Sequence, residues 1–183
     1  KMYGTGYHKG RFYILEERCT TSLSDYLNNL RNKASAKDRK FTGLGLAKVV
    51  AITNHALRGI KHLHDRDLIH FDIKPANLLF GQDFFLKIGD LNATKKEGQD
   101  HNEYVVTRWY RAPEIFLKRK PYTKSVDIWA LACTIFEAAY GSPLFQVESG
   151  IKKAFSIFNK VLGPIPLTLL PPTYTSKVVQ AKN

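Results

Sequence analysis

The pattern of hydrophobic and polar residues predicts three longer helices. Between residues 46 and 63 they lie three or four positions apart, which predicts an amphipathic helix built on Val49, Ile52, Ala56, Ile60 and Leu63. Residues 125–140 are apolar almost all round, as in a helix that is buried inside its protein. A third helix is predicted over 151–162 and ends at Gly163-Pro164.

Shorter elements are predicted before and between these helices. Residues 11–18 contain the apolar run Phe-Tyr-Ile-Leu and predict a strand, whereas the glycine-rich residues 4–10 predict a flexible turn. Hydroxyl side chains at the start of 21–27 predict a short capped helix, followed by a basic loop over 32–42.

A hairpin is predicted further along, because two short apolar runs near 78–80 and 84–88 flank the turn Gly81-Gln82-Asp83. The proline-rich tail from residue 164 predicts irregular structure. Helix therefore dominates the expected structure, with a few short strands and no internal repeat.

The composition is that of an ordinary globular domain. Of the 183 residues, 44% are hydrophobic and 24% charged, which excludes intrinsic disorder as the main description. Two cysteines, Cys19 and Cys133, exclude a disulfide scaffold and suit a reducing compartment, so we expect an intracellular protein of the cytoplasm or nucleus. The longest apolar stretch, 128–140, is too short to cross a bilayer, and no membrane partner is expected.

The net charge is strongly positive, with 28 Lys and Arg against 16 Asp and Glu and a formal charge of +12. The basic residues cluster over 31–40 and 118–124 and have no aromatic residues interleaved for base stacking. We therefore expect solvated surface or contacts with acidic protein partners, and we do not expect nucleic acid as the ligand.

Candidate chemistry gathers between a predicted helix and a predicted strand. Asp72 could accept a proton from a hydroxyl, Lys74 could neutralise phosphate oxygens, and Asn77 could give an oxygen to a hard cation. Asp90, at the end of the next predicted strand, suits a second oxygen ligand for Mg²⁺. Either the stretch from Asp72 to Asn77 or the strand that ends in Asp90 could occur by chance, but both in this order favour a single site.

These residues lie in motifs that resemble the catalytic domain of eukaryotic protein kinases. His70–Asn77 resembles the catalytic-loop signature, Asp90-Leu91-Asn92 the metal-binding Asp-Phe-Gly, and Ala112-Pro113-Glu114 the end of the activation segment. The run 105–111 is typical of the group that contains MAP kinases and cyclin-dependent kinases (CMGC). The resemblance covers nearly the whole chain.

The resemblance implies a protein-kinase-like α+β fold, a mainly α-helical C-terminal lobe with short β-hairpins and with the N-terminal lobe largely missing. Residues 1–20 would be the last N-lobe strand and the hinge, and 21–183 the C-terminal lobe, truncated before its final helices. The sequence has no credible glycine-rich phosphate loop and no strand lysine to hold the phosphates. We therefore expect the 183 residues alone to be inactive.

The implied activity is transfer of the γ-phosphoryl group of ATP to serine or threonine hydroxyls of protein substrates. Asp72 would orient the hydroxyl and take its proton, Lys74 would stabilise charge on the transferred group, and Asn77 and Asp90 would hold Mg²⁺. Thr107 and Lys74 favour Ser/Thr over Tyr as the target, and analogy with the group suggests proline after it. A regulatory protein partner is compatible with this group.

The nucleotide site would begin at the hinge. Backbone groups of Glu17 and Cys19 would hydrogen-bond the adenine, and Leu79 would lie under it as the pocket floor. Glu16 would then occupy the gatekeeper position, where an apolar residue or threonine is commoner.

Two departures from the family pattern bear on activity. Phe71 replaces the arginine that pairs with a phosphorylated activation loop, so phosphorylation would control activity less tightly. Leu91-Asn92 replaces Phe-Gly, where leucine would keep an apolar anchor and Asn92 would tolerate a positive φ. A second interpretation therefore stays open, a pseudokinase or truncated relic that binds protein partners without catalysis. Tyr104, at the place of the MAP-kinase activation pair, either is phosphorylated or packs.

Other polar and aromatic residues are expected to support the fold. The pair His62 and His64 is expected to pack or lie on the surface rather than bind metal, and His70 and Asp127 to brace the catalytic loop. The expected core includes two tryptophans, Trp109 and Trp129.

Overall fold

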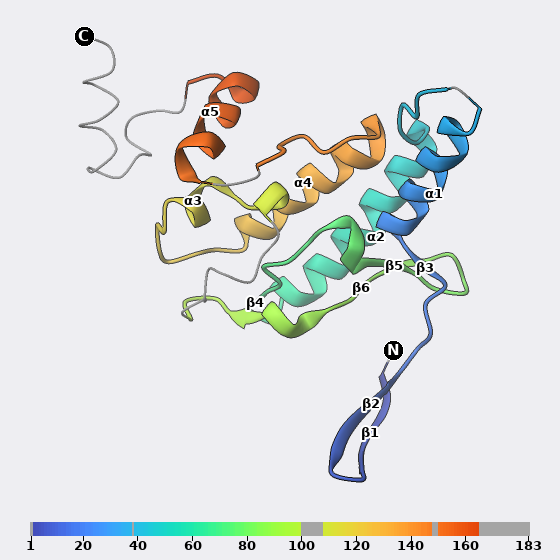
Figure 1. Cartoon of the computed structure of the whole chain (residues 1–183). Coiled ribbons are helices and arrows are strands. Elements are labelled where there is room, and N and C mark those ends of the chain that lie inside the picture. The colour runs from blue at the N-terminus through green and yellow to red at the C-terminus, as the bar shows by residue number, and fades with distance from the viewer. Residues whose placement is uncertain (1, 38, 100–107, 148–149, 165–183) are drawn as a thin grey trace.

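A computed structural model of the chain describes residues 2–37, 39–99, 108–147 and 150–164. Helices form the body of the molecule, and short antiparallel strands lie beside them or project from them (Figure 1). This arrangement confirms the predicted fold class, mainly helical with short hairpins. The described helices are α1 (Leu23–Ser35), α2 (Leu46–His64), α3 (Pro113–Phe116), α4 (Ser125–Tyr140) and α5 (Ile151–Leu162).

Helix α1 begins where the sequence predicts and runs further than expected. The Ser22 hydroxyl accepts a hydrogen bond from the Asp25 N–H at 3.0 Å, so a hydroxyl side chain caps the helix as predicted. The helix continues to Ser35, so the prediction of a loop is wrong for residues 32–35. An ion pair explains the extension, because Arg31 Nη2 lies 2.7 Å from Glu137 Oε1 and ties this end of α1 to α4.

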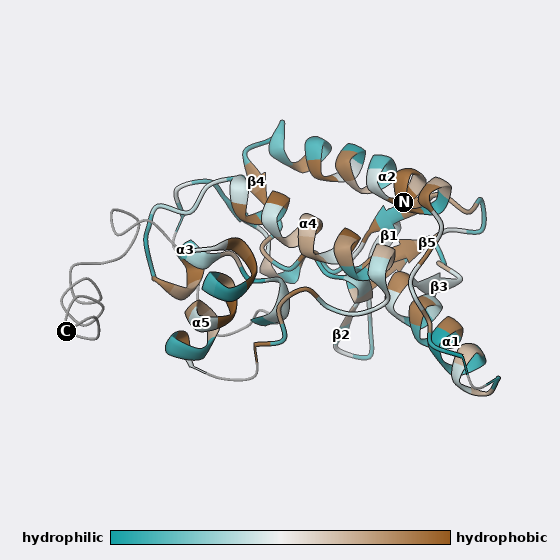
Figure 2. Ribbon diagram, turned by 90° about the horizontal axis from the view of Figure 1, so that it is seen from above, coloured by the Kyte–Doolittle hydropathy of each residue, from teal (hydrophilic) through white to brown (hydrophobic). Residues whose placement is uncertain are grey.

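Helices α2 and α4 lie against each other and carry much of the core. The predicted apolar face of α2 is confirmed, since Ile52, Ala56 and Ile60 are buried. Figure 2 shows hydrophilic residues along the outer side of α2 and apolar residues toward α4. Helix α4 is buried as expected, with Cys133 and Ala138 in the core.

Helix α5 has the bounds that the sequence predicts and packs through aromatic rings. Phe158 is buried and contacts the rings of Phe116, Trp129 and Phe145 edge to face, at centroid distances of 5.8, 5.8 and 4.9 Å. Trp129 also stacks on Phe145 at 5.5 Å. Such ring pairs stabilise by about 0.5–1.5 kcal/mol each beyond the area they bury.

The N-terminal residues form an antiparallel hairpin of β1 (Met2–His8) and β2 (Arg11–Glu16) that projects from the body (Figure 1). The prediction of a turn over 4–10 is therefore wrong for most of its length, and the turn is confined to Lys9-Gly10. Pairing with β2 satisfies the backbone of the glycine-rich stretch and overrides its weak strand propensity. Most side chains of the hairpin are exposed.

Two small sheets position the catalytic-loop sequence. Strands β3 (Thr21–Ser22), β5 (Leu78–Phe80) and β6 (Leu86–Ile88) form one sheet in the order β3-β5-β6. Strands β4 (Leu68–Ile69) and β7 (Lys95–Lys96) form the other. The predicted hairpin is confirmed, but its second strand begins at Leu86, because Phe84 adopts φ 60° and extends the turn.

Two further findings concern burial. Trp109 has 39% of its surface exposed, so its assignment to the core is wrong, whereas Trp129 packs against the core as predicted. None of the helices in the described residues has the length and apolarity needed to cross a membrane.

Candidate active site

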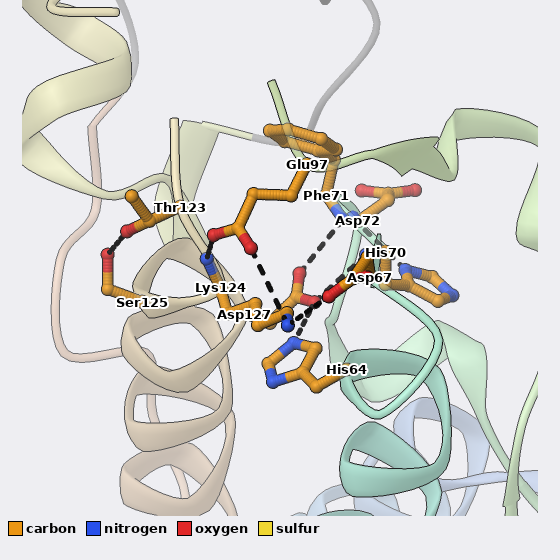
Figure 3. A network of polar contacts seen from close by, with 10 residues as sticks. All are labelled: His64, Asp67, His70, Phe71, Asp72, Glu97, Thr123, Lys124, Ser125 and Asp127. Atoms are coloured by element: carbon orange, nitrogen blue, oxygen red, sulfur yellow. Dashed lines mark hydrogen bonds and ion pairs between the residues drawn. The ribbon is translucent and has the colours of Figure 1, made fainter. Parts of the chain in front are cut away.

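Three of the four predicted catalytic residues, Asp72, Lys74 and Asn77, lie in the loop that joins β4 to β5, which includes the 3₁₀ turn Pro75–Asn77. The loop is anchored from below by Asp127 of α4, which is completely buried. Asp127 accepts hydrogen bonds from the backbone N–H groups of His70 and Phe71, both at 2.9 Å (Figure 3). His64 Nε2 lies 2.8 Å from Asp127 Oδ2, and the predicted structural roles of Asp127 and His64 are thereby confirmed.

The bracing role of His70 is confirmed as well. The Asp72 N–H donates to Nδ1 of the buried His70 ring at 3.1 Å, so Nε2 carries the proton and donates to the Gly89 carbonyl at 3.1 Å. Gly89 directly precedes Asp90 in the sequence. One imidazole therefore connects the catalytic loop to the end of β6.

Three of the predicted site residues meet around one carboxylate. Lys74 Nζ lies 2.8 Å from Asp72 Oδ2, and Asn77 Nδ2 donates to the same oxygen at 3.0 Å and to the Asp72 carbonyl at 2.8 Å. The other oxygen, Asp72 Oδ1, is buried and has no hydrogen-bond partner among the described residues. Asp72 thus has one oxygen fixed in place and one available to accept a proton or a hydrogen bond.

Asp90 lies two positions after the end of β6 and is exposed. It adopts φ 57°, and its carboxylate accepts the Asn92 N–H at 3.4 Å. The positive φ therefore falls on Asp90 and not on Asn92, which corrects the expectation for Asn92. Leu91 is 55% exposed, so the expected apolar anchor is not seated; its place in a 3₁₀ turn directs it to solvent.

Asn77 and Asp90 supply one amide oxygen and one carboxylate as candidate metal ligands. No cluster of three or more His, Cys, Asp or Glu side chains suited to a metal occurs in the parts of the chain that the structure describes. Mg²⁺ does not need such a cluster, since it is commonly held by one or two carboxylates, water and substrate phosphates. The donor chemistry of the two residues therefore fits Mg²⁺ bound together with a nucleotide.

The predicted adenine-binding residues lie along the sheet that contains β5. The Thr20 N–H donates to the Phe80 carbonyl at 2.8 Å, which holds the segment after β2 against the end of β5. Glu17 forms an ion pair with Lys87 of β6, which lowers the pKa of Glu17 and raises the pKa of Lys87. Cys19 is half-buried in this segment, and the Glu16 side chain is exposed.

Leu79 occupies the central strand β5, between Ser22 and Lys87. A Cβ atom on Gly89 would lie 2.6 Å from Leu79 Cδ1, so glycine at this position lets the end of β6 approach the predicted pocket floor. Thr107, the remaining predicted site residue, and Tyr104 lie outside the described residues.

A network that joins α1, Tyr110 and the far end of α4 was not predicted. The Tyr110 hydroxyl donates to Glu137 Oε2 at 2.6 Å, and Arg31 Nη2 lies 2.7 Å from Glu137 Oε1. Burial raises the pKa of Tyr110 above its ordinary value. The three residues are far apart in the sequence; the one signal was a glutamate within the apolar helix α4.

Comparison with known proteins shows the family of the chain. The family model of the protein kinase domain matches residues 1–179. Cyclin-dependent kinase-like 5 of Mus musculus is 36% identical over 162 residues, which are 86% of this chain and 16% of that protein. Extracellular signal-regulated kinase 1 of Dictyostelium discoideum is 43% identical over 112 residues, 59% of this chain and 21% of that protein.

A plant relative adds to this group. Mitogen-activated protein kinase 11 of Arabidopsis thaliana is 48% identical over 110 residues, 59% of this chain and 30% of that protein. The chain thus matches less than a third of the length of these three relatives. The chain belongs to the protein kinase family, and its relatives are those of the CMGC group.

Proposed function

We propose that this domain transfers the γ-phosphoryl group of ATP to serine or threonine hydroxyls of protein substrates. The observation that carries the proposal is the state of Asp72, whose Oδ2 is held by Lys74 and Asn77 while its buried Oδ1 has no partner among the described residues. A carboxylate held in this way is ready to orient a hydroxyl and to accept its proton.

The residues around Asp72 support the remaining steps. Phosphoryl transfer needs positioning and charge stabilisation more than covalent chemistry from the protein. The Lys74 ammonium, 2.8 Å from Asp72 Oδ2, would stabilise the negative charge that develops on the transferred group. The connection from Asp72 through His70 to Gly89 keeps the proposed base in a fixed relation to Asp90.

Mg²⁺ and ATP are part of the proposal. Asn77 and Asp90 would hold the ion, which when bound neutralises charge on the phosphates. Glu17 and Cys19, in the segment held against the end of β5, and Leu79 of β5 itself would bind the adenine. The family supports this pair of ligands, because protein kinases use ATP and Mg²⁺.

Substrate choice rests on sequence motifs. Lys74 and Thr107 favour Ser/Thr targets, and Arg111 in the Trp-Tyr-Arg-Ala-Pro-Glu run favours proline after the target residue. Protein substrates, and a regulatory protein partner inside the cell, fit the relatives of the CMGC group. The 183 residues alone are proposed to transfer phosphate poorly, since the sequence carries no credible glycine-rich phosphate loop with a following strand lysine.

The test is peptide phosphorylation by the full-length protein with Mg²⁺ and ATP, using peptides with and without proline after the target serine. Asp72→Asn should lower kcat by a factor of about 10²–10⁴, the usual contribution of a general base. Asp65→Asn is the matched control, because Asp65 is an exposed carboxylate paired with Lys61 at 2.7 Å. If the wild-type protein folds, binds partners and transfers no phosphate, the pseudokinase interpretation replaces this one.

A further inference from the structure

Strands β4 and β7 connect the two carboxylates of the proposed site. Strand β4 ends at Ile69, three positions before Asp72, and β7 begins at Lys95, five positions after Asp90. The strands are antiparallel, with Leu68 opposite Lys96 and Ile69 opposite Lys95. The register of this pair is therefore one restraint on where Asp90 lies relative to Asp72, beside the His70 bridge and the bond from the Gly89 N–H to the Asn77 carbonyl at 2.9 Å.

A ladder of two residues on each side is too short to fix its own register. A slip by one residue would shift one strand by about 3.3 Å and turn its side chains to the other face. Displacements of about 1 Å already cost enzymes up to two orders of magnitude in rate. The pair therefore needs a further restraint.

Lys124, the residue that precedes α4, supplies contacts to both strands. Its Nζ lies 2.7 Å from Asp67 Oδ1 and 3.5 Å from Glu97 Oε2 (Figure 3). Asp67 directly precedes β4 and Glu97 directly follows β7, so both acids stand at the same end of the ladder. The backbone N–H of Lys124 also donates to Glu97 Oε1 at 3.3 Å, and the Glu97 N–H donates to the Asp67 carbonyl at 2.8 Å.

The charges of this cluster support one another. The Lys124 ammonium holds the pKa of Asp67 below its usual value, and Asp67 raises the pKa of Lys124. The Lys124 side chain is 33% exposed, Glu97 35% and Asp67 74%, so water and salt reach the contacts. Concentrated salt should therefore weaken the ion pairs of Lys124 with Asp67 and Glu97.

Phe71, two positions after β4, restrains the loop that follows this strand through apolar contacts. Phe71 stands where an arginine occurs in the family motif, and its ring contacts Tyr122 edge to face at 6.1 Å. It lies in an apolar cluster with Ile69 and Val126. Apolar contacts and Asp127 thus hold the loop after β4. Lys124 holds the other end of the β4–β7 pair, where Asp67 and Glu97 lie.

We propose that Lys124 is a positioning residue that holds the register of β4 against β7 and thereby, together with the His70 bridge, the separation of Asp72 and Asp90. The inference rests on the proposed function, because it assumes that the two carboxylates act on one Mg²⁺-bound nucleotide. Lys124 itself contacts neither of them in the described contacts.

The experiment compares Lys124→Met, Lys124→Arg and Glu97→Gln in the full-length protein, with steady-state phosphorylation at varied Mg²⁺. Lys124→Met should lower kcat about tenfold and raise the Mg²⁺ concentration for half-maximal rate, while the KM for peptide stays unchanged. Lys124→Arg should restore most of the rate, and Glu97→Gln should share the defect in part. In 1 M salt, where the Debye length is about 3 Å, wild type and Lys124→Met should converge.

Lys61→Met is the matched control, because Lys61 forms an exposed ion pair of the same 2.7 Å length with Asp65 at the end of α2. The inference is wrong if Lys124→Met and Glu97→Gln need the same Mg²⁺ concentration for half-maximal rate as the control Lys61→Met. It is also wrong if Lys124→Met loses rate only in proportion to lost thermal stability. An active Asp72→Asn protein would instead overturn the proposed function, so the two failures are distinguishable. If Lys124→Met does not fold, Glu97→Gln decides in its place.

Discussion

The backbone N–H of Asp72 donates to Nδ1 of His70 at 3.1 Å, and the opposite nitrogen of the same ring donates to the carbonyl that precedes Asp90. The imidazole therefore restrains the distance between Asp72, the proposed base, and Asp90, the proposed metal ligand. His70 is completely buried, so its two hydrogen bonds do not compete with water.

Replacing His70 by phenylalanine should keep the shape of the core and remove both bonds. The Asp72 N–H and the Gly89 carbonyl would be left unsatisfied, at a cost of about 1–3 kcal/mol for each buried group. We expect a lower free energy of unfolding in urea together with a loss of kcat. His62→Phe is the control, since His62 is exposed, and equal effects of the two changes would contradict this role.

Asp127→Ala should be among the most destabilising single changes in the described part of the chain. It leaves the N–H groups of His70 and Phe71 and the ring of His64 without their acceptor. The expected loss is about 3–5 kcal/mol in the free energy of unfolding, measured by urea or thermal denaturation. Asp83→Ala, at an exposed carboxylate, should change it far less.

Gly43→Ala should destabilise the contact between the loop before α2 and the end of α4. Gly43 has φ +97°, and a Cβ atom there would lie 1.9 Å from the Ala139 carbonyl oxygen. Gly163 has φ +84° and no described atom within 4 Å of such a Cβ. Gly163 also has ψ 178°, a backbone region that is essentially restricted to glycine, so Gly163→Ala should cost about 1–3 kcal/mol of backbone strain alone. Gly43→Ala should cost clearly more, because steric overlap adds to its own backbone strain. Equal losses in thermal unfolding would show that the close approach is absent.

The buried hydroxyl of Tyr110 should make the free energy of unfolding fall at alkaline pH. Burial raises its pKa in the folded state, so above about pH 10 the unfolded chain loses a proton that the folded chain keeps. The stabilisation is present below the unfolded pKa of tyrosine and is lost as the pH rises toward the folded value. Unfolding in urea should show stability falling above pH 10 more steeply in wild type than in Tyr110→Phe. Parallel slopes would contradict it.

The sequence predicted best those elements whose pattern repeats over several turns. Helices α2, α4 and α5 have nearly the predicted bounds, because each has a run of apolar residues long enough to show a helix and α2 buries the face that its period predicts. The grouping of Asp72, Lys74 and Asn77 followed from their closeness in the chain, and the structure brings them together.

Long-range contacts account for the errors. Residues 4–10 were predicted as a turn because their strand depends on pairing with β2. Residues 32–35 were predicted as loop because their helix is held by the Arg31–Glu137 pair, which no local pattern reveals. The positive φ at Asp90 and the exposure of Leu91 and Trp109 depend likewise on the path of the backbone.

The central claim is that Asp72 acts on the acceptor hydroxyl while Asp90 holds Mg²⁺, and one paired measurement tests it. Binding of ATP with Mg²⁺ and single-turnover transfer to a serine peptide are measured on wild type, Asp72→Asn and Asp90→Asn of the full-length protein. We predict that Asp72→Asn binds the nucleotide like wild type and transfers phosphate about 10²–10⁴ times more slowly, whereas Asp90→Asn loses the Mg²⁺-dependent part of binding. Undiminished transfer by Asp72→Asn would contradict the account.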